Sequence, residues 1–127
     1  MKARSQPKPS ACCAPKPELA QRPLLGVAQA GELAAVFSML ANDTRLRLLH
    51  ALVQAGELSV TALAEAVGMK PQAVSNQLQR LNDRGIVATR REGTSIIYRL
   101  VDPCVATLLD RGWCLTEDAN TRTGKGR

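Results

Sequence analysis

Residues 57–99 read ELSVTALAEAVGMKPQAVSNQLQRLNDRGIVATRREGTSIIYR. The apolar spacing predicts a short helix, a tight turn and a second helix, and the alternating segment that follows predicts a β-hairpin with arginines near its tip. This order of elements is typical of a winged helix-turn-helix, which places its second helix in the DNA major groove and its hairpin on the flanking backbone. The stretch therefore predicts DNA binding.

Both helices of this stretch have residues suited to begin and end them. Ser59 or Thr61 can cap the first helix, and Gly68 can adopt the left-handed conformation that ends many helices. Because proline is tolerated in a first helical turn, we expect the second helix over Pro71–Arg84. Its buried face is predicted to consist of Val74, Leu78 and Leu81.

Further helices are predicted on both sides of this stretch. Apolar residues recur with helical spacing over residues 30–41, and Asn42 or Asp43 can cap a second helix that reaches about Ala55. Asp102-Pro103 combines a capping residue with a first-turn proline, so a final helix should begin there and reach Gly112 or beyond. The buried side of the helix that ends near Ala55 is predicted to consist of Leu46, Leu49, Leu52 and Val53.

The strands are predicted to be few and short. Residues 86–91 and 95–100 should pair across a turn near Glu92-Gly93-Thr94, and residues 57–59 can pair briefly as well. With one Trp, one Tyr and one Phe, the core must be built from Leu, Val, Ile and Ala, which favours helix packing. The predicted fold class is mainly α with a small β-hairpin, in a winged helix-turn-helix.

Length and composition predict a single globular domain with flexible ends. The chain has 127 residues, and five of its seven prolines fall in residues 1–23, which we expect to form a flexible basic arm. The domain is predicted over residues 24–117, and residues 118–127 are predicted to be a disordered tail. Neither a membrane-spanning apolar run nor a signal peptide is recognisable, so we expect a cytoplasmic protein with no membrane partner.

The positive charge of the chain is unevenly distributed. The formal net charge is +6, of which residues 1–22 supply +4 and residues 118–127 supply +2, so the domain between them is neutral. Within that neutral domain, six Lys or Arg face two acidic residues over residues 70–99. A basic patch on a neutral domain indicates a localised electrostatic footprint for DNA. The alternative is a solvated helix face with basic tails.

The exposed face of the predicted second helix carries amide, hydroxyl and guanidinium groups. Gln and Asn can form paired hydrogen bonds with adenine, and Arg can do so with guanine. Arginines beside a glycine turn suit contact with the DNA backbone or minor groove. An ordinary surface helix beside an ordinary hairpin is the competing interpretation. The predicted DNA-binding residues are Lys70, Gln72, Ser75, Asn76, Gln77, Arg80, Arg90, Arg91 and Thr94.

The motifs of the chain resemble those of the ArsR/SmtB family of metal-responsive repressors. The stretch Ala41–Leu49, ANDTRLRLL, resembles the signature that opens the family's second helix, and Gln72–Leu78, QAVSNQL, follows in the family's order. The similarity covers roughly residues 30–112 and continues through Gly85-Ile86-Val87 and Tyr98-Arg99-Leu100. It implies a homodimeric winged-helix repressor whose first and last helices form the dimer interface. Gln77 stands where the family often has His.

The resemblance also directs attention to the cysteines. Arsenic and cadmium sensors of the family carry a Cys-x-Cys in a region that corresponds to residues 57–61, which contain no cysteine here. A second family site on the last helix opens with Asp-x-His, and Asp102-Pro103-Cys104 resembles that opening with Cys in place of His. Cys114 and Glu117 lie near the later ligands of that site, about one residue short of the usual spacing.

Helix geometry limits how the cysteines could share an ion. Cys104 and Cys114 are ten residues apart, or ~15 Å along a helix, whereas a metal–sulfur bond is only ~2.3 Å. They could meet across an antiparallel pair of final helices in a dimer, or Cys12 or Cys13 could fold over to complete a site. Thiolates favour soft ions such as Cd(II), Pb(II), Hg(II), Zn(II) or As(III). Alternatively, Cys104 is a small buried hydrophobe, Asp102 is only a helix cap, and Cys12 and Cys13 are incidental thiols of the arm.

Two functions are compatible with these residues. In the first, the apo homodimer binds double-stranded operator DNA and is released when Cd(II), Pb(II), Hg(II) or As(III) binds Cys12, Cys13, Cys104 or Cys114 as the effector. In the second, a disulfide between an arm cysteine and Cys104 or Cys114 switches the same repressor. An enzyme is disfavoured, because the chain has one His, no Ser-His-Asp set and no phosphate-binding glycine loop.

Overall fold

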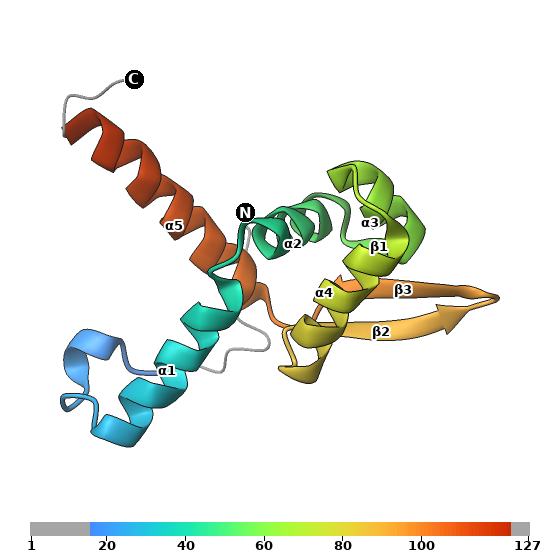
Figure 1. Ribbon diagram of the computed structural model, residues 1–127. Coiled ribbons are helices and arrows are strands. Elements are labelled where there is room, and N and C mark those ends of the chain that lie inside the picture. Colours follow the sequence, from blue (N-terminus) through green and yellow to red (C-terminus); the bar gives the residue numbers. More distant parts are fainter. Residues whose placement is uncertain (1–15, 123–127) are drawn as a thin grey trace, which may run out of the picture.

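The computed structural model describes residues 16–122 of the chain (Figure 1). Its strands form one antiparallel sheet in the order β1-β3-β2, and α2, α3 and α4 pack beside this sheet. This arrangement is a winged helix-turn-helix and confirms the predicted fold class. In chain order the elements are η3 (Leu19–Gln21), α1 (Val27–Leu40), α2 (Asp43–Ala55), β1 (Glu57–Ser59), α3 (Val60–Val67), α4 (Pro71–Asp83), β2 (Val87–Glu92), β3 (Ser95–Leu100) and α5 (Pro103–Arg122).

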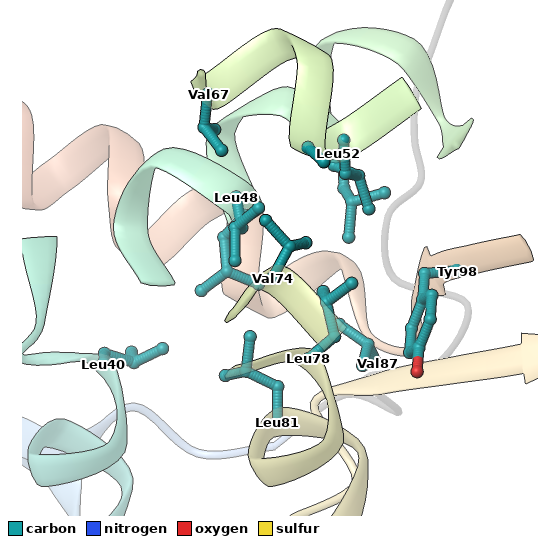
Figure 2. Packing of buried hydrophobic residues seen from close by; sticks show 12 residues of the cluster. Leu40, Leu48, Leu52, Val67, Val74, Leu78, Leu81, Val87 and Tyr98 are labelled. Atoms are coloured by element: carbon teal, nitrogen blue, oxygen red, sulfur yellow. The ribbon is translucent and has the colours of Figure 1, made fainter. Parts of the chain in front are cut away.

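The core lies where α2, α3 and α4 meet the sheet (Figure 2). Leucine and valine side chains fill it, with Tyr98 from β3 and Leu40 from the end of α1 at its edges. Burying apolar surface in this way is the main stabilising contribution to such a small domain. The fully buried side chains are Leu48, Leu49, Leu52, Leu63, Leu78, Leu81, Val74 and Val87.

Capping residues set the helix ends largely as predicted. The Asn42 side chain accepts a hydrogen bond from the Arg45 amide at 3.0 Å, and Ser59 accepts one from the Ala62 amide at 3.0 Å. Gly68 ends α3 in the left-handed region, with φ of 70°, a conformation that costs glycine no Cβ clash. Ser59, and not Thr61, is therefore the cap of α3.

The buried face of α2 differs from the prediction. Leu48, Leu49 and Leu52 point into the core, whereas Leu46 and Val53 are 37% and 39% exposed. The helix is apolar on two sides, so its spacing alone did not reveal which side packs on α3 and α4. Leu46 and Val53 are seven residues apart, two helical turns, and so share the face that turns away from the core.

Regular structure extends into both segments that were assigned to the chain ends, within the described residues. Residues 118–122, assigned to the tail, form the last turns of α5. Neither Pro nor Gly interrupts residues 113–123, and the Thr121 hydroxyl donates to the Glu117 carbonyl at 3.2 Å. At the other end, η3 lies within the predicted arm, where Arg22 Nε donates to the Pro17 carbonyl at 3.0 Å.

The helices α1 and α5 extend away from the rest of the domain (Figure 1). Large apolar side chains remain exposed on both, among them Leu33, Val36 and Phe37 on α1 and Trp113 and Leu115 on α5. Exposed apolar side chains grouped on elongated helices are typical of a surface that binds another protein chain. Over residues 16–122, none of the helices has the length and hydropathy needed to cross a membrane.

Replacing Leu48 with Ala is expected to lower the free energy of unfolding by about 2–5 kcal/mol, because the change leaves a cavity at a fully buried site. The matched control is Leu46→Ala, which should cost about 1 kcal/mol or less because this side chain is already partly exposed. Urea denaturation at one fixed protein concentration measures both values. Equal losses would contradict the assignment of the buried face.

Candidate nucleic-acid interface and cysteine site

The helix α4 presents a polar face opposite its buried one. Pro71 occupies the first helical position after the N-cap Lys70, and Val74, Leu78 and Leu81 are each fully buried. This burial turns Gln72, Asn76, Gln79 and Arg80 outward. Two of these residues are ordered by neighbours one turn away: Gln72 Nε2 donates to Asn76 Oδ1 at 3.2 Å, and Gln79 Nε2 donates to Asp83 Oδ1 at 3.1 Å.

The predicted DNA-binding residues occupy two elements, α4 with its cap and the β2–β3 hairpin. The hairpin forms the wing, with Gly93 at φ of 64° in the turn between its strands. Helix α4 packs against β2, so the two elements form one body. Seven of the predicted residues are exposed: Lys70, Gln72, Asn76, Arg80, Arg90, Arg91 and Thr94; Ser75 and Gln77 are half-buried.

Gln77 is held by a residue that the sequence did not single out. Arg45, in the first turn of α2, donates from Nε to Gln77 Oε1 at 2.9 Å. The same guanidinium donates from Nη1 to the Met39 carbonyl at 2.9 Å. Thirty-two residues separate Arg45 from Gln77, so no local sequence pattern signals this contact.

The two arginines of the wing have different surroundings. Arg90 forms ion pairs with Glu57 at 2.7 Å and with Glu92 at 3.1 Å. The hydrogen bond from Arg90 lowers the pKa of Glu57, and the bond to Glu57 is likewise the main cause that raises the pKa of Arg90. Arg91 follows Arg90 on β2 and therefore points to the opposite face of the sheet. Within residues 16–122 Arg91 makes no ion pair.

The strand register explains the contact between Arg90 and Glu57. Arg90 lies opposite Ile97 on β3, and Ile97 lies opposite Ser59 on β1. Arg90 therefore reaches diagonally across the central strand to a residue two positions along β1. Glu57 is the second residue that sequence reasoning missed, because its role depends on the order of the strands.

The last helix begins with a side-chain cap and carries two cysteines. The Cys104 amide donates to Asp102 Oδ1 at 2.8 Å, so Asp102 caps α5 as predicted. Cys104 is exposed, which argues against the alternative of a buried hydrophobe. It lines an apolar hollow of about 230 Å³ together with Leu40, Ile86 and Leu108.

Cys114 lies further along the same helix. It is an exposed free thiol whose Sγ lies 3.8 Å from Asp118 Oδ2. Among residues 16–122, no group of three or more His, Cys, Asp or Glu is placed to hold a metal ion. Cys12 and Cys13 lie outside the described residues. One chain therefore offers an incomplete ligand set in its described part.

Comparison with known proteins places this geometry in a class. A helix-turn-helix domain model matches residues 40–90. The transcriptional regulator NmtR of Mycobacterium tuberculosis is 47% identical over 81 residues, which are 64% of this chain and 67% of NmtR. The structure of a homodimeric winged helix-turn-helix DNA-binding domain from Mycobacterium bovis, a possible ArsR-family regulator, matches with a TM-score of 0.64 and 38% identity, covering 72% of this chain and 83% of that one.

The crystal structure of AntR, an antimony-specific transcriptional repressor, matches with a TM-score of 0.73. The two sequences are 60% identical, and the match covers 86% of this chain and 98% of the AntR chain. The fold and these relatives define a DNA-binding transcriptional regulator and not an enzyme. The chain belongs to the ArsR/SmtB family of metal-responsive transcriptional repressors, as the sequence motifs predicted.

Replacing Arg91 with Ala is expected to weaken DNA binding for all sequences and to reduce the slope of log K against log salt by about 0.9, the effect of one lost phosphate contact. Arg90→Ala is the matched comparison on the next residue. Its charge is already paired with Glu57 and Glu92, so the slope should change by less than half as much. Fluorescence anisotropy across a salt series measures both slopes, and equal changes would refute the distinction.

Proposed function

We propose that the chain is a homodimeric operator-binding repressor that a trivalent metalloid, antimonite or arsenite, releases from DNA. The observation that carries this proposal is the 60% sequence identity with AntR, an antimony-specific repressor. The match covers 98% of the AntR chain. As(III) was among the ions expected from the cysteines, whereas Sb(III) was not. The antimony-specific relative favours ion sensing over the disulfide alternative.

DNA binding in this proposal uses α4 and the wing. Lys70, Gln72, Asn76 and Arg80 lie on the exposed side of α4 or at its start, where they can reach base edges and phosphates in a major groove. Arg91 and Thr94 can contact the flanking backbone from the wing. Two copies related by a two-fold axis would place their α4 helices on half-sites about one helical turn apart, roughly 34 Å.

The dimer would form through the apolar residues that one chain leaves exposed. Leu33, Val36 and Phe37 of α1 and Trp113 and Leu115 of α5 lie on the two helices that extend from the domain (Figure 1). The related domain from Mycobacterium bovis is homodimeric. Covering these side chains with the same helices of a second copy would remove them from water and stabilise the pair.

The effector site is proposed to form between the two chains. Cys104 and Cys114 of one α5 are ~15 Å apart by helix rise, too far to share one ion. Two antiparallel α5 helices would bring Cys104 of one chain toward Cys114 of the partner subunit, and Cys12 or Cys13 could complete a set of thiolates. Thiolates favour soft ions, and the bound metalloid would supply covalent links between sulfurs of the two subunits.

Release requires the metalloid to favour the dimer geometry that binds DNA poorly. A ligand that binds both geometries equally shifts nothing. A coupling free energy of about 1–3 kcal/mol, or a 5- to 150-fold change in operator affinity, is usual for such systems. Because α5 carries both cysteines and exposed apolar residues, an ion held there can alter how two chains pack.

The test is operator-binding anisotropy of the reduced protein with Sb(III), As(III), Cd(II), Pb(II), Hg(II) and Zn(II). Cys104→Ser and Cys114→Ser should bind the operator as the parent protein does but should no longer be released by Sb(III) or As(III). Thr107→Ser, an exposed position on the same helix, is the matched control and should respond normally.

Two outcomes would overturn parts of the proposal. Unchanged release of the Cys104→Ser/Cys114→Ser variant at the same metalloid concentration would exclude these thiols as ligands. If the reduced protein ignores all six ions while an oxidant releases the operator and mass spectrometry finds a disulfide, the redox alternative is correct.

A further inference from the structure

Arg45 connects two elements that are far apart in the sequence. From the first turn of α2, its guanidinium donates to Gln77 on α4 and to the Met39 carbonyl in the last turn of α1, both at 2.9 Å. Both bonds are partly buried, and bonds from a charged donor are stronger than neutral ones. One side chain therefore joins the end of α1 to the helix that is proposed to enter the major groove.

The bond from Arg45 to α1 gives a hydrogen-bond donor to a carbonyl that has none within the helix, that of Met39. The last four carbonyls of a helix lack partners within that helix and carry partial negative charge. In α1 the Phe37 carbonyl accepts from the Ala41 amide and the Leu40 carbonyl from the Asn42 amide, whereas Arg45 serves the Met39 carbonyl. Apart from this bond, α1 is joined to the core chiefly by Leu40, which is buried, and by the adjacent Met39.

The bond to α4 fixes the orientation of the Gln77 amide. Arginine has hydrogen-bond donors only, so the Gln77 atom that faces it must be the carbonyl oxygen. The amide nitrogen of Gln77 consequently points the other way and presents donors. With its oxygen engaged, Gln77 is arranged to donate to an acceptor on DNA, a phosphate or a base edge, and is poorly arranged for the two-sided contact with adenine.

We propose that Arg45 is a positioning residue for DNA binding: it sets the orientation of Gln77 and ties that orientation to the position of α1. Arg45 acts through Gln77 and not through a contact of its own with DNA. A displacement of the last turn of α1 relative to α2 would weaken the bond between the Met39 carbonyl and Arg45. The guanidinium would then be less firmly placed and would hold the Gln77 amide less well. This proposal concerns DNA binding by the ion-free protein and does not depend on the metalloid.

A double-mutant cycle on operator affinity tests the proposal. Arg45→Met keeps the aliphatic stem but loses the guanidinium, and Gln77→Met keeps the length but loses the amide. Each single variant should bind the operator about tenfold more weakly, and the double variant should be about as weak as either one, because both changes remove the same arrangement. The salt slope should stay unchanged in Arg45→Met, since no phosphate contact is lost.

Arg47→Met is the matched control. Arg47 lies two residues along α2 and also donates to a backbone carbonyl, that of Val67 at 3.1 Å, but it makes no hydrogen bond to α4 among the described residues. Its loss should change operator affinity less than twofold. If Arg47→Met and Arg45→Met lowered operator affinity by similar factors, the cause would be the loss of any bond to a backbone carbonyl. That result would overturn the proposal.

A further variant separates folding from DNA contact. Gln77→Glu keeps an acceptor for Arg45 but replaces the outward donor with a carboxylate, so operator affinity should fall at least tenfold without a lower midpoint of thermal unfolding. Additive losses in the cycle would overturn the proposal. So would a drop of about 0.9 in the salt slope of Arg45→Met, which would identify Arg45 as a phosphate contact.

Discussion

The burial of one face of α4 determines which of its residues can meet DNA. Val74, Leu78 and Leu81 have no exposed surface, because they pack into the core that α2, α3 and the sheet surround (Figure 2). A helix with three anchored positions over two turns cannot rotate about its axis without exposing them, at a cost of about 1.5–3 kcal/mol for each side chain. The outward direction of Gln72, Asn76 and Arg80 is therefore a consequence of the core.

Local features of the sequence were sufficient to predict the order and ends of most elements. Asn42, Ser59, Gly68 and Pro71 act within one helical turn of their own position, so a single stretch carries the whole signal. The buried face of α2 was harder, because an apolar residue on each side of the helix satisfies the same spacing. Packing against α3 and α4 decides between these faces, and packing is not a local property.

The candidate site shows the same division. The exposed positions of α4 followed from its spacing, but the contacts of Arg45 with Gln77 and of Arg90 with Glu57 join residues 32 and 33 positions apart. Such pairs depend on which helix lies beside which and on the order of the strands. The contact of Arg90 with Glu57 also changes how much unpaired positive charge the wing presents. A count of charges treats Arg90 and Arg91 alike, whereas the wing pairs Arg90 with two carboxylates and leaves Arg91 unpaired among the described residues.

The positions of the cysteines and of Arg45 suggest how the proposed ion site on α5 could affect Gln77 on α4. Two cysteines ~15 Å apart on one helix cannot bind the same ion within one chain. An ion shared between Cys104 of one chain and Cys114 of the partner subunit would therefore act on the arrangement of the two chains. In the proposed dimer, α1 and α5 hold the two chains together, and the last turn of α1 contains the Met39 carbonyl that Arg45 binds. Because α1 joins the core chiefly through Leu40, Met39 and this bond, a change in the position of α1 would act first on the α1–α2 junction. Gln77 lies one hydrogen bond beyond that junction, on the helix whose outward face the core fixes.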